Sequence, residues 1–178
     1  MIKLVVRLVA HKDPLSDMIL ATIGGTVAHA ELIFRGGVVI GAYAMGGVAI
    51  RNLDYDGGVF QNEVLVSLDA DDEMAAKAEH YARACIGEPY DFTGLLEFAK
   101  VAIDGHRAHH VFCSAFVDDV LRGCDFFARP LPVPARNINP RMLHQMLFVL
   151  RNIRVVSRSD SDFIEYISAP LAMKDQQQ

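Results

Sequence analysis

Apolar residues alternate with polar ones, or run in short blocks, from residue 2 to residue 68. This spacing is typical of β-strands. One short helix interrupts the pattern over residues 15–23, with Asp13 as its N-cap and Pro14 at its first position. Glycine-containing turns join neighbouring strands, so an antiparallel meander is expected. Its strands are predicted over residues 2–9, 28–34, 38–45, 48–53 and 63–68.

From residue 69 onward, apolar residues recur at helical spacing instead. In the helix predicted to begin at Cys113, the spacing turns Asp118, Asp119 and Arg122 toward solvent. The prediction is an α+β fold in which an antiparallel sheet packs against helices. The elements predicted here are a helix after the acidic run at 69–72, helices over 91–103, from 113 onward and over 140–150, an extended connection at 129–134, and a last strand near 152–157.

Composition indicates an ordinary globular chain. Of its 178 residues 52% are hydrophobic and 22% are charged, which predicts a single domain over residues 1–170. Residues 171–178 are expected to form a disordered tail. The net charge of −5 and the scattered arginines argue against a nucleic-acid partner.

No integral membrane segment is predicted, because the apolar stretch at 36–50 is short and rich in glycine. The apolar N-terminus is interrupted by Arg7 and is better read as a strand than as a signal peptide. We therefore expect a cytoplasmic protein, or a phage-encoded one that is released by other means. The three cysteines form no CxxC pair, so neither a disulfide framework nor a metal site is predicted, and no cofactor is expected.

Cys113 is the candidate nucleophile. A thiol at a helix N-terminus faces unpaired backbone N–H groups and the positive end of the helix dipole, and both favour the reactive thiolate. The same N–H groups could form an oxyanion hole. The competing interpretation is a buried cysteine that acts only as a small apolar residue, which is our interpretation of Cys85 and Cys124.

His29 is the candidate general base, because Glu31 lies two residues further on the same strand face and could orient its imidazole. A surface pair without catalytic function is the alternative. His144 competes for the role of base, with Asn137 or Asn139 as its orienting partner, although it falls in a predicted helix. The remaining histidines are expected at the surface or in a solvated loop; they are His11, His80, His106, His109 and His110.

Two stretches resemble a known family. Gly87-Glu88-Pro89-Tyr90, followed by Phe112-Cys113-Ser114, resembles the G-x-P-Y…C-S signature of NlpC-type papain-like peptidases. The earlier His29-Ala30-Glu31 resembles the H-x-E strand of the circularly permuted branch, the YaeF/YiiX-like amidases. Lecithin-retinol-acyltransferase-like enzymes are relatives of that branch. The resemblance covers residues 26–122.

The resemblance implies a permuted papain-like fold in which Cys113 is the nucleophile, His29 the base and Glu31 the orienting group. Tyr90 and Ser114 would contact substrate, and Tyr90 could help to hold the oxyanion. Relatives often carry the third polar residue on the strand after the histidine, and here that position falls near Gly41.

The implied activity is that of a cysteine hydrolase, an amidase or thiol peptidase. It would cleave a small peptide amide, such as a peptidoglycan stem peptide, through a thioester. The alternatives are a lipid acyltransferase or thioesterase that uses the same residues, and a catalytically silent binding protein of the same fold.

Overall fold

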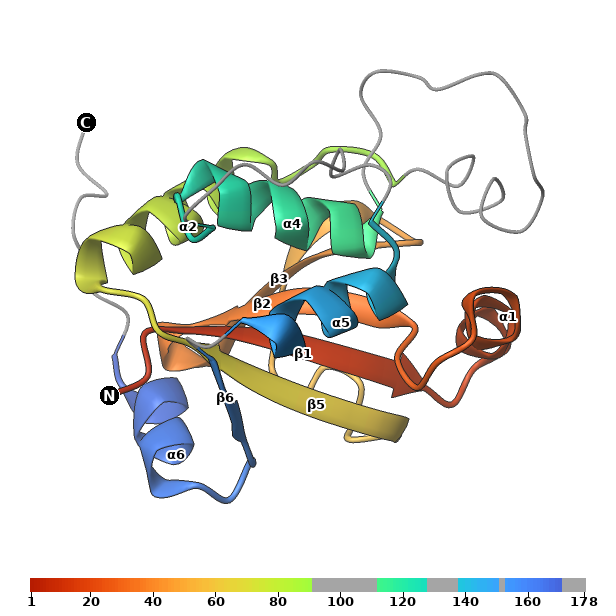
Figure 1. Cartoon of the computed structure of the whole chain (residues 1–178), viewed down its shortest axis with the longest axis horizontal. Helices are drawn as coiled ribbons and strands as arrows, with labels where there is room; N and C mark the ends of the chain where they lie inside the picture. The colour runs from red at the N-terminus through yellow and green to blue at the C-terminus, as the bar shows by residue number, and fades with distance from the viewer. Residues whose placement is uncertain (91–111, 128–137, 151–152, 171–178) are drawn as a thin grey trace.

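The computed structural model describes residues 1–90, 112–127, 138–150 and 153–170 of the chain. It has an α+β fold built on one six-stranded antiparallel sheet of order β4-β3-β2-β1-β5-β6 (Figure 1). The strands are β1 (Leu4–His11), β2 (His29–Phe34), β3 (Val38–Tyr43), β4 (Gly47–Asn52), β5 (Phe60–Leu68) and β6 (Ile153–Val156). The α-helices of the described residues are α1 (Pro14–Ile23), α2 (Asp72–Ala84), α4 (Cys113–Gly123), α5 (Pro140–Val149) and α6 (Ser161–Ser168).

Helices cover the sheet on both faces. Alternate residues of β1 and β2, such as Leu8 and Leu32, pack in one apolar cluster with residues of α2, α4 and α5. The intervening residues, such as Ile33, pack with Phe163 and Tyr166 of α6 on the opposite face. Since both faces are covered, polar residues of the central strands are buried and need partners inside the protein.

The predicted strands and helices are present within the described residues, with bounds that differ by one to three residues. Asp13 caps α1 as expected, accepting hydrogen bonds from the Leu15 and Ser16 N–H groups. Helix α6 was not predicted. The helix predicted over 91–103, the connection at 129–134 and the tail at 171–178 lie outside the described residues.

The prediction that Asp118 faces solvent is wrong. Its side chain is fully buried. Asp118 lies one turn after Ser114, whose hydroxyl donates to the Ile138 carbonyl, so this side of α4 faces the segment before α5 rather than solvent. Asp118 accepts a hydrogen bond from Arg122 Nε at 2.6 Å through Oδ2, while its Oδ1 has no partner among the described residues. Burial raises the pKa of this carboxyl group.

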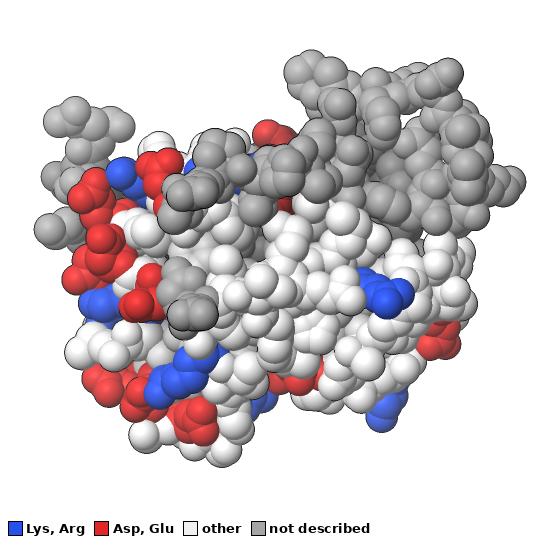
Figure 2. All heavy atoms as spheres, viewed as in Figure 1, with Lys and Arg blue, Asp and Glu red and all other residues white. Residues whose placement is uncertain are grey.

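Charged side chains are unevenly distributed over the face shown in Figure 2. They gather at the margin near α2 and α6, whereas the surface over α5 is largely uncharged. Phe148 and Val149 of α5 are both exposed. This face therefore presents no continuous basic surface. Among the described residues, no helix combines the length and the apolar character needed to cross a bilayer.

The start of β4 holds the segment that leads to Tyr90. The Val48 N–H group donates to the Glu88 carbonyl at 2.9 Å, and the Gly87 N–H group donates to the Val48 carbonyl at 2.9 Å. Gly47 allows this approach, because a Cβ atom at its position would collide with the Glu88 carbonyl oxygen. Its φ of +68° also favours glycine.

We expect Gly47→Ala to lower the free energy of unfolding by about 3 kcal/mol or more, through backbone strain and the collision with Glu88. Gly57→Ala is the matched control, since Gly57 has a φ of +62° but nothing within 4 Å of an added Cβ. This control should cost only about 1–2 kcal/mol, the strain of a left-handed residue. Urea unfolding measures both, and equal losses would contradict the close packing described for Gly47.

Candidate active site

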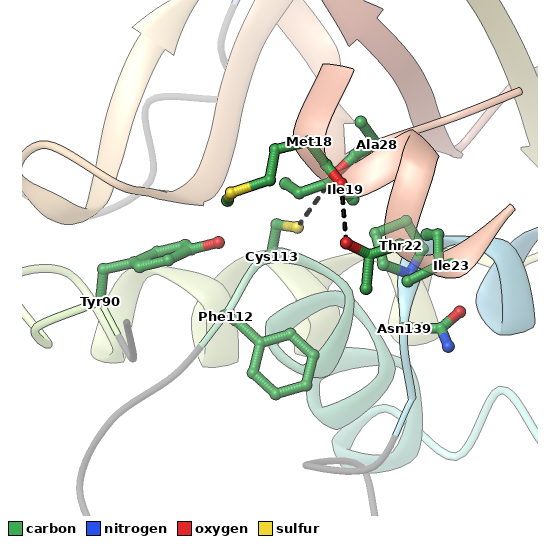
Figure 3. A pocket seen from close by; sticks show the side chains of 10 residues that line it. Met18, Ile19, Thr22, Ile23, Ala28, Tyr90, Phe112, Cys113 and Asn139 are labelled. Atoms are coloured by element: carbon green, nitrogen blue, oxygen red, sulfur yellow. Dashed lines mark hydrogen bonds between the residues drawn. The ribbon is translucent and has the colours of Figure 1, made fainter. Parts of the chain in front are cut away.

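Cys113 is the first residue of α4 and is 2% exposed. Helices α1, α2 and α5 each begin with a capping side chain, but the residue before Cys113, Phe112, makes no capping hydrogen bond. The first N–H groups of α4 therefore remain available to the sulfur. Backbone N–H groups of Ser114 and Ala30 hydrogen-bond the sulfur, which lies 4.0 Å from the Ala28 carbonyl oxygen (Figure 3).

His29, the first residue of β2, interacts directly with Cys113. Burial by itself raises the pKa of the Cys113 thiol, but the charge of His29 and a hydrogen bond with it outweigh this effect, so the pKa lies below its ordinary value. Burial lowers the pKa of His29, yet the charge of Cys113 and the same hydrogen bond, with help from Glu31, raise it to about 10. Each group therefore stabilises the charged form of the other, which favours a thiolate–imidazolium pair.

Glu31 lies on the other side of the imidazole. His29 Nε2 is 3.8 Å from Glu31 Oε2, and this buried nitrogen has no hydrogen-bond partner among the described residues. We infer that Nδ1 is the nitrogen that faces the sulfur of Cys113. Burial raises the pKa of Glu31, but the neighbouring imidazole of His29 and the charge of Arg7 lower it overall, so Glu31 is ionised at neutral pH.

Arg7 fixes Glu31 in place from the adjacent strand β1, where it is the cross-strand partner of Glu31. The fully buried guanidinium donates from Nη1 to Glu31 Oε1 at 2.8 Å, and it also pairs with Asp56 and with Glu63. Although burial opposes the charged form, these three carboxylates raise the pKa of Arg7 above its ordinary value. Arg158 pairs with Glu63 as well, so the network extends from the site to β5 and beyond.

Tyr43 completes the surroundings of Glu31. Glu31 pairs with Gly41 across β2 and β3, and continuing that register places Tyr43 opposite His29, with ring centroids 5.4 Å apart. The Tyr43 hydroxyl donates to Glu31 Oε2 at 2.7 Å, and the Tyr55 hydroxyl lies 3.3 Å from the same carboxylate. A Cβ at Gly41 would lie only 3.1 Å from Glu31 Cβ, so Gly41 leaves room for this arrangement.

The other two cysteines lack such an environment. Burial and the nearby carboxylates of Glu88 and Asp119 raise the pKa of Cys85 to about 11. Burial raises the pKa of Cys124. Of the three cysteines, Cys113 is thus the one whose pKa is lowered.

His144 does not take part in the arrangement around Cys113. It lies half-buried on α5 with its ring 4.8 Å from Phe148, and it lines neither of the two pockets described below. Asn139 caps α5 by accepting a hydrogen bond from the Met142 N–H group at 2.8 Å. The structure therefore brings His29, rather than His144, to Cys113. The loop histidines 106, 109 and 110 and Asn137 lie outside the described residues.

The two predicted substrate contacts differ in their geometry. The Tyr90 hydroxyl points toward Cys113, and its ring borders the cleft (Figure 3). The Ser114 side chain is fully buried and donates to the Ile138 carbonyl, so its hydroxyl anchors α4 to the segment before α5. Ser114 contributes to the site through its backbone N–H group.

Two pockets meet at the Cys113–His29 pair, and Ile19, Ala28 and Tyr90 line both of them. The pocket on the Cys113 side is mainly apolar, with Met18, Ile19, Ile23, Phe112 and Pro140 in its wall (Figure 3). The pocket on the His29 side is more polar: besides apolar residues such as Leu15 and Met45, its wall holds His11, Asp13, Tyr43, Arg51 and Tyr55. The cleft therefore offers two chemically different sides to a ligand.

Sequence reasoning missed several residues of the site. His11, predicted at the surface, has a side chain that is only 20% exposed and bonds Asp56 at 3.1 Å. Arg7 stood out as a charge inside an apolar strand, and a buried charge requires ionic partners, which was the available signal. Tyr43 can be assigned to the site only when the register of β2 and β3 is known, and Tyr55 only when the fold of the loop after β4 is known.

Comparisons with known proteins support the fold alone. No protein-family model matches the chain, and no curated protein matches it. Its fold is similar to that of YiiX from Escherichia coli O157:H7, described as a metalloprotein of the DUF1105 family. The TM-score is 0.60 and the sequence identity 16%, over 86% of this chain and 94% of YiiX. The chain thus has a YiiX-like fold.

The metalloprotein description of YiiX prompts a test of the donor set in this chain. Among the described residues, no group of three or more histidine, cysteine, aspartate or glutamate side chains is arranged to hold a metal ion. Residues around His29 are instead paired with Arg7 and with Cys113. The donor set of the described residues does not fit a metal ion.

We expect Arg7→Met to lower the free energy of unfolding by about 3–5 kcal/mol, because it leaves Glu31, Asp56 and Glu63 without their shared buried cation. Arg154→Met is the matched control, since Arg154 pairs with Asp162 at the exposed surface and its loss should change little. Chemical denaturation measures both variants. A tolerated Arg7→Met would show that the network does not depend on this charge.

We expect Cys113 to react with iodoacetamide at pH 7 much faster than Cys85 or Cys124, because only its pKa is lowered. The rate should fall only as the pH drops through that lowered pKa. In His29→Ala the imidazolium charge is lost and the effect of burial dominates, so the pKa of Cys113 rises. Each unit of this rise reduces the thiolate fraction by about tenfold.

The measurement is site-resolved mass spectrometry of alkylation between pH 5 and pH 10. His144→Ala is the control and should keep the wild-type profile. If His144→Ala abolishes the reactivity of Cys113 while His29→Ala preserves it, the pairing described here is wrong.

Proposed function

We propose that this protein is a cysteine-dependent hydrolase, an amidase or peptidase of permuted papain-like fold, that cleaves a small amide through a thioester. The observation that carries the proposal is the thiolate–imidazolium pair of Cys113 and His29 at the uncapped start of α4. The YiiX-like fold supports it, as does the order of the elements in this chain, where the histidine strand β2 precedes the cysteine helix α4.

In the first half-reaction the Cys113 thiolate adds to the substrate carbonyl carbon. The carbonyl oxygen gains negative charge, and the Cys113 backbone N–H group and the Tyr90 hydroxyl would hold it. The C–N bond then breaks as His29 gives its Nδ1 proton to the leaving nitrogen. The products of this step are an amine, a Cys113 thioester and a neutral His29.

In the second half-reaction neutral His29 takes a proton from water, and the hydroxide formed attacks the thioester carbonyl. The C–S bond breaks, the acid leaves, and the thiolate–imidazolium pair is restored. Glu31, held ionised by Arg7, would stabilise the imidazolium through Nε2 in both steps. The 3.8 Å separation is of the loose kind that tightens when substrate binds.

The apolar wall on the Cys113 side favours a second candidate, a lipid acyltransferase or thioesterase with the same residues. Met18, Ile23 and Phe112 could receive an alkyl chain next to the sulfur. The two candidates share the thioester and differ in the bond that is cleaved. A peptidoglycan stem peptide remains our proposed substrate for the amidase reaction.

The test is capture of the acyl-enzyme. The full chain is incubated with stem peptides containing a γ-glutamyl amide bond, and separately with p-nitrophenyl alkanoates, and the intact protein is weighed by mass spectrometry. We expect an acyl adduct on Cys113 and product release that His29→Ala slows by about 100-fold or more, as expected for loss of a general acid–base.

Cys113→Ala must abolish turnover, whereas Cys124→Ala, which removes a buried thiol outside the site, should preserve it. Turnover that survives Cys113→Ala would refute the proposal. Turnover of esters alone would favour the second candidate. If no substrate reacts and Cys113 has no advantage toward iodoacetamide, the chain is a binding protein.

A further inference from the structure

Arg51 of β4 is a half-buried cation. Among the described residues, its guanidinium has no carboxylate partner and forms no ion pair or side-chain hydrogen bond. Its guanidinium carbon lies 3.8 Å from the centroid of the Tyr43 ring and 4.7 Å from that of Tyr55. A cation–π contact uses the charge of the guanidinium rather than its N–H donors, so these donors can still bind a ligand. Arg7 differs, because three carboxylates surround it.

Arg51 also lies in the same pocket as His29. Both residues line the polar side of the cleft, and the Tyr43 ring contacts both, at 5.4 Å from the His29 ring and 3.8 Å from Arg51. A ligand held by Arg51 would therefore extend past the imidazole toward the sulfur of Cys113.

The other charged groups of this pocket are already engaged. Asp13 uses one carboxylate oxygen to accept the Leu15 and Ser16 N–H groups, each at 2.9 Å, and the other to accept the Ser16 hydroxyl at 2.9 Å. His11 bonds Asp56. Arg51 is thus the charged group in the described wall of the pocket that is left for a ligand.

The proposed reaction assigns a role to this side of the cleft. His29 delivers a proton to the leaving nitrogen or oxygen, so the leaving group lies on the His29 side, and the acyl part lies against the apolar wall beside Cys113. Guanidinium groups bind carboxylates and phosphates through two parallel hydrogen bonds.

Resting on the proposed function, we infer that Arg51 forms an oxyanion-binding subsite for the leaving group. The substrate is then an amide or ester whose acyl part is apolar near the carbonyl and whose leaving group carries a carboxylate or a phosphate. An amino acid or peptide would supply the carboxylate, and a lipid headgroup would supply the phosphate. The contacts with the Tyr43 and Tyr55 rings hold the guanidinium at this place in the pocket.

The test measures protection of Cys113 from iodoacetamide at constant ionic strength and pH 7. N-acetylglycine is the carboxylate probe and glycerol 3-phosphate the phosphate probe, with N-acetylglycinamide and glycerol as their uncharged counterparts. We expect at least one anion to slow alkylation in a saturable manner while both uncharged compounds leave it unchanged. Protection by one anion alone identifies the source of the charge.

In Arg51→Gln the anion concentration for half-protection should rise by about tenfold or more, the loss expected when a charged hydrogen bond is removed. Arg51→Lys should lie between this variant and the wild type, because it keeps the charge without the planar fork. Arg154→Gln is the matched control, with the same change of charge far from the cleft. In this variant the anion should protect Cys113 at the same concentration as in the wild type.

Equal protection in Arg51→Gln and the wild type, or no protection by either anion, would overturn the subsite. The alkylation rate of Cys113 relative to that of Cys85, measured without any anion, tests the proposed function separately. A fast Cys113 that no anion protects would refute the subsite and leave the hydrolase proposal standing, whereas a slow Cys113 would refute the hydrolase proposal itself.

Discussion

The buried ion pair of Arg7 and Glu31 is the constraint on which the site depends. A carboxylate inside a sheet that is covered on both faces would lose its charge without a cation, and a neutral Glu31 could not stabilise an imidazolium at His29. Arg7 keeps the charge and fixes the position of Glu31. Tyr43 holds the same carboxylate from the neighbouring strand, so β1, β2 and β3 all contribute to the orientation of one imidazole.

Helix α4 provides the other half of the arrangement. Its apolar face lies on the sheet and α2 packs against it as well, so its first turn is held at the beginning of β2. The residue before α4 provides no capping side chain, so the sulfur of Cys113 can accept hydrogen bonds from the first N–H groups of this helix. In α1, α2 and α5 the corresponding N–H groups donate to an Asp or Asn side chain. The fold thereby combines a helix terminus and a strand terminus into one polar centre with a low-pKa thiol.

Local patterns predicted most of the fold. Alternation and helical spacing located the strands and helices, and Asp13 and the glycine turns marked their ends, because these signals depend on neighbouring residues. The proximity of Cys113 and His29 was expected from motif order. The burial of Asp118 was not, because it depends on how distant segments of the chain, such as the one before α5, pack against α4. Tyr43, Tyr55 and Arg51 were also beyond reach, since they meet only after the strands pair and the loop after β4 folds back.

Gly41 has a consequence for how this architecture could diversify. An added methyl group there would press on Glu31 and on the Tyr43 ring at 3.1–3.2 Å. A chain of this fold can therefore place the carboxylate beside the imidazole either from β2, the strand of the histidine, or from the adjacent β3. It cannot carry a carboxylate at both positions without a change in the packing around residues 31, 41 and 43. Moving the acid across would require two exchanges at once, a small residue at 31 and a long polar one at 41, and either change made alone leaves a crowded or an empty site.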